Sequence, residues 1–337
     1  MIILGIESSC DETAAALVRD GREILSSVVA SQIDVHNQYG GVVPELASRM
    51  HLEAIVPVVE QAFGKAGLRV DEIDAVAATR GPGLTGALLV GFTFAKSFAW
   101  AKNLDFAGVN HLEAHIHSLF LSDNPPEFPF TALVVSGGHT NIYNVSSEDD
   151  FELMGQTRDD AAGEAFDKVA KMLGLGYPGG PVIEKTAIGK DPGLISFPRT
   201  MLEPESFDFS FSGLKSSVAR YIHTENIRTD SEKAQVAASF QEAVIDVLSA
   251  KVIMAAQHRA NSMIGVAGGV SANRTFIKKL SEKARKKGIK VFTPPCDLCG
   301  DNGAMIAARG YSLIRKGRLC TLEQDVFSRE KINTSGF

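Results

Sequence analysis

Short apolar runs separated by polar turns dominate the start of the chain. Residues 2–6, 14–18 and 24–30 have the composition of buried strands, and the acidic, hydroxyl-rich segment 7–13 separates the first two runs. Asp20-Gly21 is a turn signal between the second and third runs. The pattern therefore predicts that the chain opens with three consecutive antiparallel strands.

A similar pattern returns after the proline-rich segment 123–129. Residues 131–135 and 141–145 are again apolar runs, and the tight turn 136–140, which contains two glycines, joins them. A segment rich in proline interrupts regular structure and is typical of a boundary between domains. We therefore predict two halves of similar architecture, with the first boundary in this segment.

Other segments show helical periodicity or short apolar runs. A long helix is expected from Pro44 onward, a core helix at 232–260, and a small-residue helix at 303–313. Short buried strands are expected at 76–79 and 106–109, at the start of 264–273, and at 291–294. The tail from Asp325 is polar, and we expect it to be loosely held.

The glycine-rich segment 81–86 has two interpretations. It precedes an expected helix at 87–100, so its backbone N–H groups could hold an anion at the helix N-terminus. Alternatively, its small residues let that helix pack closely. It is not a P-loop, because Lys followed by Ser or Thr is missing at the required place. The helix itself is more apolar than a surface helix needs to be, which indicates an interface with another protein.

Glycine-rich turns in the second half are candidates for nucleotide binding. Gly137 and Gly138 permit close approach of a backbone to a phosphate. The segment 174–181 is expected to be a loop that admits a flat ligand. The segment 264–273 is a strand that leads into a Gly-Gly turn and a helix, where Asn273 could read a nucleoside.

His111 and His115 carry the strongest signal for a metal site. They are spaced i, i+4 on an expected helix, so both imidazoles can reach one ion. Asp301, in a glycine-flanked turn near the end of the chain, is the candidate third ligand. The simpler alternative is a pair of ordinary half-buried histidines. A zincin protease is excluded, because Glu113 lies off the face that the two histidines share.

Composition and charge place limits on the class of protein. The chain has 337 residues, 45% of them hydrophobic and 22% charged, which is typical of two soluble globular domains. The N-terminal apolar run has no basic segment before it, and we expect a cytoplasmic protein with no membrane association. Four cysteines do not form a secreted disulfide framework, and Cys296-x-x-Cys299 is interpreted as a disulfide or as two inert thiols.

The net charge of −6 gives no global signature of nucleic-acid binding, so any RNA contact must come from a local patch. One basic segment stands out between residues 274 and 290. Its alternative interpretation is a solvated helix face. The segment contains eight cationic residues, Arg274, Lys278, Lys279, Lys283, Arg285, Lys286, Lys287 and Lys290.

Six strings, taken in order, resemble one family of proteins. They cover almost the whole chain, and together they are very specific. The strings are Glu7-Ser-Ser-Cys-Asp-Glu-Thr13, the decapeptide 40–49, the His111/His115 pair, Ser136-Gly-Gly-His-Thr140, Gly163-Glu-Ala-Phe-Asp-Lys168 and Ala267-Gly-Gly-Val-Ser-Ala-Asn273. The chain resembles the TsaD family of bacterial tRNA threonylcarbamoyltransferases, once labelled O-sialoglycoprotein endopeptidases. Its strand–turn patterns also resemble the wider actin/Hsp70/sugar-kinase superfamily.

The resemblance implies an α/β fold of two ribonuclease-H-like domains of the actin/Hsp70 type, with an active-site cleft between them. The first actin-like domain is expected at 1–125 plus 300–337, with the C-terminal helix packed back onto it. The second, nucleotide-binding domain is expected at 126–299.

The resemblance also implies an activity and a set of site residues. The expected reaction moves the threonylcarbamoyl group from threonylcarbamoyl-AMP to the exocyclic amine of the adenosine 3′ of the anticodon, in tRNAs that read codons beginning with A. One Fe²⁺ per subunit, or Zn²⁺, would be held by His111, His115 and Asp301. The implied partner proteins are TsaB and TsaE. The residues implied to contact the adenylate are Val134, Val135, Ser136, Gly137, Gly138, Asp167, Gly180, Glu184 and Asn273.

The acceptor amine must also lose a proton, and Asp11 or Glu12 is the candidate base. Two other classes stay open at this point. A small-molecule kinase of the same superfamily would need an acid in its cleft and no transition metal. A regulatory module would bind and hydrolyse ATP without modifying a second substrate.

Overall fold

The computed structural model describes residues 1–200 and 205–329, and this part of the chain divides into two compact units. The first unit runs from Met1 to Pro125 and resumes at Pro294, and the second runs from Pro126 to Thr293. The chain leaves the first unit within the proline-rich segment 123–129.

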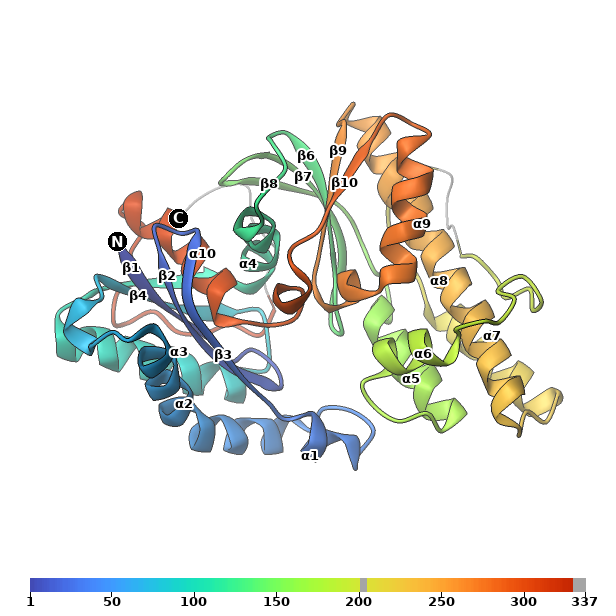
Figure 1. Ribbon diagram of the computed structural model, residues 1–337, viewed down its shortest axis with the longest axis horizontal. Coiled ribbons are helices and arrows are strands. Elements are labelled where there is room, and N and C mark those ends of the chain that lie inside the picture. Colours follow the sequence, from blue (N-terminus) through green and yellow to red (C-terminus); the bar gives the residue numbers. More distant parts are fainter. Residues whose placement is uncertain (201–204, 330–337) are drawn as a thin grey trace. The chain divides into compact units, whose positions relative to one another are not determined.

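The first unit is built on a five-stranded mixed sheet with the order β3-β2-β1-β4-β5 (Figure 1). The first three strands pair antiparallel in sequence, while β4 pairs parallel with β1 and β5 pairs parallel with β4. The expected opening of three antiparallel strands is therefore confirmed. The strands are β1 (Ile2–Glu7), β2 (Glu12–Arg19), β3 (Glu23–Ser31), β4 (Ala75–Gly81) and β5 (Asp105–Asn110).

Helices cover both faces of this sheet. Side chains alternate between the two faces of a strand. Leu4 and Ile6 pack with α2 (Pro44–Ala66) and α3 (Thr85–Lys102), whereas Ile3 packs with α10 (Gly303–Arg315). A helix from near the end of the chain therefore completes the unit formed by its start. The remaining helices of this unit are α1 (Ile33–Asn37) and α4 (His111–His117), with 3₁₀ turns η1 (Val70–Glu72), η2 (Ser118–Leu121) and η4 (Cys296–Leu298).

The second unit repeats the same sheet topology. Its strand order is β10-β9-β6-β7-β8, in which β6, β7 and β8 pair antiparallel, β9 pairs parallel with β6, and β10 with β9. The predicted similarity of the two halves is thus confirmed, although the pattern did not predict β8. The strands are β6 (Phe130–Val135), β7 (Thr140–Ser147), β8 (Asp150–Gln156), β9 (Met263–Ala267) and β10 (Lys290–Phe292).

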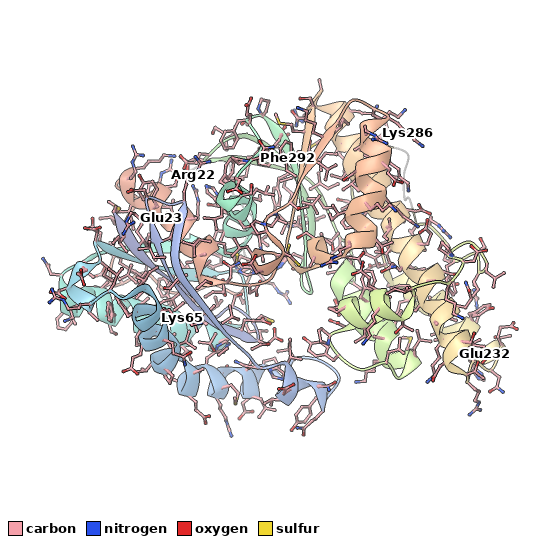
Figure 2. All side chains as sticks on the ribbon, viewed as in Figure 1. Arg22, Glu23, Lys65, Glu232, Lys286 and Phe292 are labelled. Atoms are coloured by element: carbon pink, nitrogen blue, oxygen red, sulfur yellow. The ribbon has the colours of Figure 1, made fainter. Side chains whose placement is uncertain are left out.

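Five helices within the described residues complete the second unit. The longest, α8, begins close to Glu232, which is labelled in Figure 2, and its buried face forms much of the core as expected. The segment 174–181 was expected to be a loop, but α6 begins at Gly179, whose N–H is accepted by Asp167 at 2.6 Å. The helices are α5 (Ala162–Leu173), α6 (Gly179–Thr186), α7 (Ser212–Thr224), α8 (Asp230–His258) and α9 (Arg274–Arg285), with the 3₁₀ turn η3 (Gly269–Ala272).

The glycine-rich segment 81–86 lets neighbouring backbone segments pack closely against it. A Cβ on Gly81 would lie 2.1 Å from the carbonyl oxygen of Phe327, and one on Gly83 would lie 2.7 Å from that of Ser9. These contacts support the close-packing interpretation, and the N–H groups of Gly83 and Leu84 donate to Ser328 O and Ser9 O within the protein. The contact also corrects the expectation for the tail, because the N–H of Phe327 donates to Arg80 O at 3.1 Å. Residues from 330 onward lie outside the described residues.

None of the helices in the described part of the chain is long and apolar enough to cross a membrane.

A stability test follows from the contact between β1 and α10. A Cβ on Gly5 would lie 2.2 Å from the carbonyl oxygen of Gly303 and 2.5 Å from the N atom of Ala307, both of which are backbone atoms. We expect Gly5→Ala to lower the free energy of unfolding by about 1–3 kcal/mol, because α10 must move away from the sheet.

Urea denaturation measures this change. Gly64→Ala is the matched control, since a Cβ at Gly64 meets nothing within 4 Å. Alanine favours a helix over glycine, so the control should be neutral or more stable. Equal stability of the Gly5→Ala variant and the parent chain would contradict the close-packing argument.

Candidate functional site

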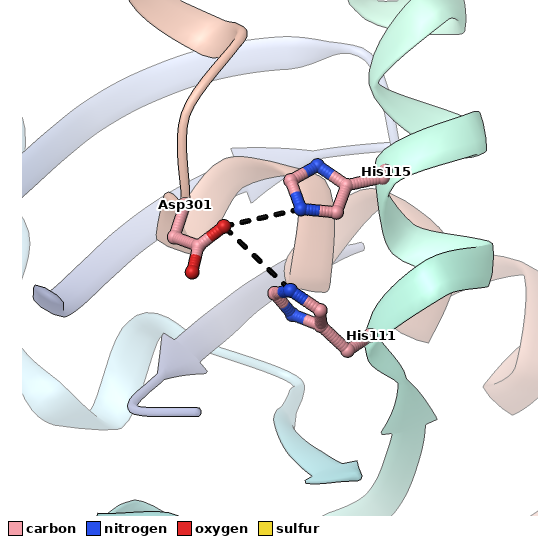
Figure 3. Close-up of side chains that lie close together, drawn as sticks. All are labelled: His111, His115 and Asp301. Atoms are coloured by element: carbon pink, nitrogen blue, oxygen red, sulfur yellow. Dashed lines mark ion pairs between the residues drawn. The ribbon is translucent and has the colours of Figure 1, made fainter. Parts of the chain in front are cut away.

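Two histidines and one aspartate of the first unit converge as Figure 3 shows. The Nε2 atom of His115 lies 3.1 Å from Asp301 Oδ1, and that of His111 lies 3.6 Å from the same oxygen. One donor atom from each residue lies within 4.8 Å of the others, which makes the group suitable for a metal ion. The structure therefore brings together the three residues that the sequence suggested as ligands.

The surroundings of His115 fit a bound ion. This side chain is fully buried; its Nε2 atom faces Asp301 Oδ1 at 3.1 Å without hydrogen-bond geometry, and its Nδ1 atom has no hydrogen-bond partner among the described residues. Coordination of Nε2 to an ion would offset the cost of burying that nitrogen, which is on the order of 1–3 kcal/mol. Two imidazoles and one carboxylate are also the donor set that binds Fe²⁺ or Zn²⁺ with positions left for substrate.

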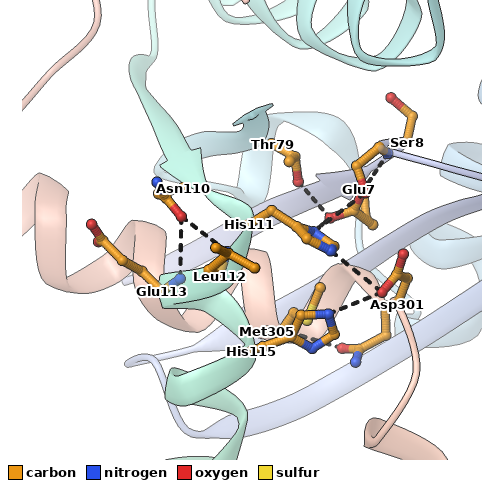
Figure 4. A network of polar contacts seen from close by, with 12 residues as sticks. Glu7, Ser8, Thr79, Asn110, His111, Leu112, Glu113, His115, Asp301 and Met305 are labelled. Carbon is orange, nitrogen blue, oxygen red and sulfur yellow. Dashed lines mark hydrogen bonds and ion pairs between the residues drawn. The ribbon is translucent and has the colours of Figure 1, made fainter. Parts of the chain in front are cut away.

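The buried carboxylate of Glu7 orients His111 (Figure 4). His111 Nδ1 lies 3.0 Å from Glu7 Oε2, which also accepts a 2.6 Å hydrogen bond from Thr79 Oγ1. The other oxygen of Glu7 accepts from the N–H of Ser9. With Nδ1–H donating to Glu7, the lone pair of Nε2 points toward Asp301, as a ligand histidine requires. Sequence reasoning missed this role, although Glu7 opens the first of the six strings.

The parallel strands explain why these residues meet. Glu7 ends β1, Thr79 lies near the end of β4, and His111 follows β5 directly. These three strands are adjacent and parallel, so their carboxyl ends share one edge of the sheet. Residues that are distant in the sequence are thereby placed side by side.

Two asparagine caps fix the segments that carry the ligands. Asn110 Oδ1 accepts the N–H groups of Leu112 and Glu113 at the start of α4, one residue before His111. Asn302 Oδ1 accepts the N–H of Met305 at 2.9 Å and so starts α10 directly after Asp301. A capping asparagine satisfies backbone donors that the helix itself leaves open. Both ligand segments are therefore locally rigid.

Glu113 lies on the other side of α4. Its Oε2 atom accepts from both Nε and Nη2 of Arg309 on α10, each at 2.7 Å. This ion pair ties the histidine helix to the helix that follows Asp301. Glu113 faces away from the metal candidate, so it is not placed to activate water as a zincin glutamate does.

Acidic groups from the turn after β1 lie close to the same centre. Asp11 is buried, and burial together with the charges of Asp11 and Asp301 raises the pKa of Glu12 well above its usual value. Burial and the same acids also raise the pKa of the Cys10 thiol. A buried cluster of this kind is costly unless protons or a cation neutralise it.

Buried His51 makes two hydrogen bonds to the turn that follows β1. The carbonyl oxygen of Cys10 can only accept, so His51 Nε2 is the donor in the 3.0 Å contact between them. In a neutral ring Nδ1 is then the acceptor, and it accepts from Thr13 Oγ1 at 2.7 Å. Burial lowers the pKa of His51, which agrees with a neutral ring in this role. All four cysteines are free, which excludes the disulfide and leaves unlinked thiols.

The second unit has an open glycine turn between β6 and β7. A Cβ on Gly137 or Gly138 would meet nothing within 4 Å, and both residues are exposed. The turn is closed by the N–H of Ser136, which donates to His139 O at 2.8 Å. Gly163 at the start of α5 packs against it, with its N–H donating to Ser136 O. Exposed backbone N–H groups of this kind suit a phosphate.

The other residues expected to bind the adenylate differ in which of their groups could contact it. The side chains of Val134 and Val135 are fully buried, so only their backbones could contact a ligand. Gly180 follows Gly179, whose N–H donates to Asp167, and a Cβ on Gly180 would meet nothing within 4 Å. Asn273 caps α9 by accepting from the N–H of Phe276, and it donates to Gln241.

Glu184 also serves the start of α9. Its Oε1 atom accepts the N–H of Thr275 at 2.9 Å. Glu184 and Asn273 therefore shape the same helix terminus. Together with the glycine turn, these residues make up a candidate nucleotide site of the second unit, while the three candidate metal ligands lie in the first.

Solved structures define the class of fold. A HypF structure from T. kodakarensis is 14% identical with a TM-score of 0.63, and it covers 94% of this chain and 48% of its own. Component A of the (R)-2-hydroxyglutaryl-CoA dehydratase of Acidaminococcus fermentans is 15% identical with a TM-score of 0.53, covering 93% and 98%. The two repeated sheets and these neighbours identify an α/β protein of two ribonuclease-H-like units, as in the actin/Hsp70 superfamily.

Sequence comparison then gives the family. Residues 23–308 match the family model described as TsaD: tRNA N6-adenosine threonylcarbamoyltransferase. A protein of this name from Desulforapulum autotrophicum is 63% identical over 98% of this chain and 99% of its own length. Another, from Syntrophus aciditrophicus, is 52% identical over 100% and 99%. The chain belongs to the TsaD family of tRNA N6-adenosine threonylcarbamoyltransferases.

The metal-free protein should respond to pH through His111. Burial opposes the charged ring, but the charges of Asp301 and Glu7 outweigh it and raise the pKa of His111 from 6.5 to about 9. The protonated ring stabilises the fold fully below pH 6.5, and this stabilisation is lost as the pH rises through about 9. We expect the melting temperature after chelation to fall across that interval.

Metal binding should show the opposite dependence, because the ion must displace the proton. The affinity for Zn²⁺, measured by calorimetry, should rise with pH, and binding at pH 7.5 should release about one proton. His111→Gln should abolish both the pH dependence of the affinity and the proton release. His223→Gln, which changes an exposed residue of α7, is the control and should keep both. Proton release by the His111→Gln protein would show that another group is displaced.

Proposed function

We propose that this chain transfers a threonylcarbamoyl group from threonylcarbamoyl-AMP to the exocyclic amine of the adenosine 3′ of the anticodon, in tRNAs that read codons beginning with A. The match to the family over nearly the whole chain carries the proposal. The metal-type group of His111, His115 and Asp301 supports it. Because tRNA is the acceptor, we place the protein in the cytoplasm.

His111, His115 and Asp301 would hold Fe²⁺, with Zn²⁺ as the alternative, because two imidazoles and a carboxylate suit either ion. When bound, the ion supplies Lewis-acid polarisation of the threonylcarbamoyl carbonyl. Glu7 keeps His111 in the ligand tautomer, and the Glu113–Arg309 pair fixes α4 against α10. The protein therefore contributes mainly a preformed geometry.

The second unit, Pro126–Thr293, would bind the adenylate. The backbone of Val134 to Gly138 would face its phosphate, since the turn is open and its glycines are exposed. Asp167 and Gly180 would line the approach, and Glu184 and Asn273 would act by shaping the start of α9. Negative charge on the departing AMP would be stabilised by backbone N–H groups.

The chemical step then needs positioning and one proton acceptor. The amine nitrogen forms a bond to the carbamoyl carbon, the bond from that carbon to the phosphate oxygen breaks, and AMP leaves. The amine proton would pass to Asp11 or Glu12. An exocyclic adenine amine is a poor nucleophile, so holding it in line supplies much of the rate.

TsaB and TsaE are the proposed protein partners. Four large apolar side chains on α2 and α3 are exposed, namely Leu52 (65%), Val56 (49%), Leu89 (40%) and Trp100 (72%). Leu88 and Phe92 of α3, which are also apolar, are instead buried within the unit. We propose that these exposed apolar side chains form the surface for TsaB.

A transfer assay tests the reaction. The protein, its partners, threonylcarbamoyl-AMP and unmodified tRNA would be mixed, and the digested nucleosides analysed by mass spectrometry. Threonylcarbamoyladenosine should form and should be lost in His111→Ala. No product in the presence of bound metal and confirmed partners would favour the alternative, an ATP-binding kinase or regulatory module.

Asp11→Ala tests the proton acceptor. If Asp11 is the base, turnover should fall by about 10²-fold or more, while metal content and affinity for the adenylate stay unchanged. Rapid-quench turnover and equilibrium binding measure the two quantities separately. Loss of adenylate affinity at unchanged turnover would instead make Asp11 a binding residue.

Leu89→Asp tests the partner surface. A charge placed in an apolar contact should weaken TsaB binding by 10-fold or more, because the charge must be desolvated in the complex. Isothermal titration measures the affinity, and Ile188→Asp, at an exposed apolar residue of the second unit, is the control. Unchanged affinity in the Leu89→Asp protein would exclude this surface.

A further inference from the structure

The basic segment around α9 divides into two groups of cations. On one side, Lys279 and Lys283 pair with Glu242 and Asp246 of α8. The remaining cations are exposed and have no ion pair with the described residues; Lys286, at the end of α9, is labelled in Figure 2. This second group consists of Arg274, Lys278, Arg285, Lys286, Lys287 and Lys290. Only the first group is explained by packing of the unit.

Three of the exposed cations form a line along the helix. At 100° per residue, Arg274, Lys278 and Arg285 fall within about 40° of one another around the axis. They span about 16 Å at 1.5 Å per residue. We call these three residues the α9 stripe. Lys279 and Lys283 project from a different side of the helix, toward α8.

Helix electrostatics do not account for the stripe. Cations are favoured in the last turn of a helix, which explains Arg285. Arg274 is the first residue of α9, where a cation is opposed by the helix dipole, and the acid at this terminus is Glu184 of α6, which accepts the N–H of Thr275. No ion pair joins Arg274 to Glu184 among the described residues, so the Arg274 side chain stays available to a further anion.

The position of the stripe indicates which anion. The stripe starts at Arg274, between Asn273 and Thr275. Asn273 caps α9, and Glu184 accepts the N–H of Thr275. The stripe therefore begins at the candidate nucleotide site of the second unit. It then leads away from that site along one helix. A linear series of charges at several-ångström intervals suits a phosphodiester chain.

We propose that the α9 stripe binds the backbone of the tRNA strand next to the target adenosine. This inference rests on the proposed function, since it assumes that the acceptor tRNA is brought to the adenylate held at that site. A membrane surface is the weaker match, because the stripe is flanked by polar Ser281 and acidic Glu282 and presents no large apolar side chain for insertion.

The double variant Lys278→Gln/Arg285→Gln tests the proposal in the full chain, under the conditions that support the transfer assay. The KM for tRNA should rise about 10-fold near 0.1 M salt, with little change in kcat, because the contacts precede the chemical step. The slope of log affinity against log salt should become shallower by roughly 1.5 to 2, since two phosphate contacts are lost.

Arg22→Gln/Lys65→Gln is the control, because it removes the same charge from exposed positions of the first unit, labelled in Figure 2. The control should keep the parental salt slope. If both double variants change the slope equally, the effect is one of net charge and the stripe is excluded. An unchanged slope in Lys278→Gln/Arg285→Gln, with normal transfer by the parent chain, overturns this inference alone. Absence of transfer and tRNA binding by the parent chain overturns the proposed function as well.

Discussion

The close contact between Gly5 and Gly303 is the constraint on which the first unit depends. It lets a helix from near the end of the chain lie directly on its first strand, with no side chain between them. Asp301, two residues before Gly303, is thereby brought to the edge of the sheet where His111 begins α4. The Glu113–Arg309 pair then fixes α4 against α10. Backbone proximity therefore decides the geometry of the metal candidate before any ligand chemistry does.

Electrostatics of the same centre depend on a balance of buried charge. Glu7 and Asp301 surround His111 with negative charge, and without an ion the imidazole must carry the compensating proton. The turn that bears Asp11 adds further carboxyl groups, one of which has a raised pKa. A divalent cation would replace the protons that these groups otherwise need. The centre is thus stabilised without metal when His111 is protonated, and it can bind metal when His111 has lost that proton.

The sequence predicted the elements with strong periodicity and missed features set by tertiary contacts. The opening hairpin, α2 and α8 were expected from apolar spacing alone. The strand β8 and the start of α6 were not, because β8 has weak alternation and α6 begins where Asp167 accepts a backbone N–H. The role of Glu7 was also hidden, since it depends on three parallel strands ending together. The i, i+4 spacing predicted the His111/His115 pair. The ion pairs of Lys279 and Lys283 with α8 could not be predicted, because they join residues far apart in the sequence.

The repeated strand order sets two hairpin turns at equivalent places, one after β1 and one after β6. The first turn carries acidic side chains, and the second presents bare glycine backbone. One scaffold thus offers opposite polarity in its two copies, attractive to a cation in one and to an anion in the other. Duplication of a single ancestral module, followed by divergence of a few turn residues, would produce this division of labour. Two copies of one strand order can therefore take different roles through their turn residues alone.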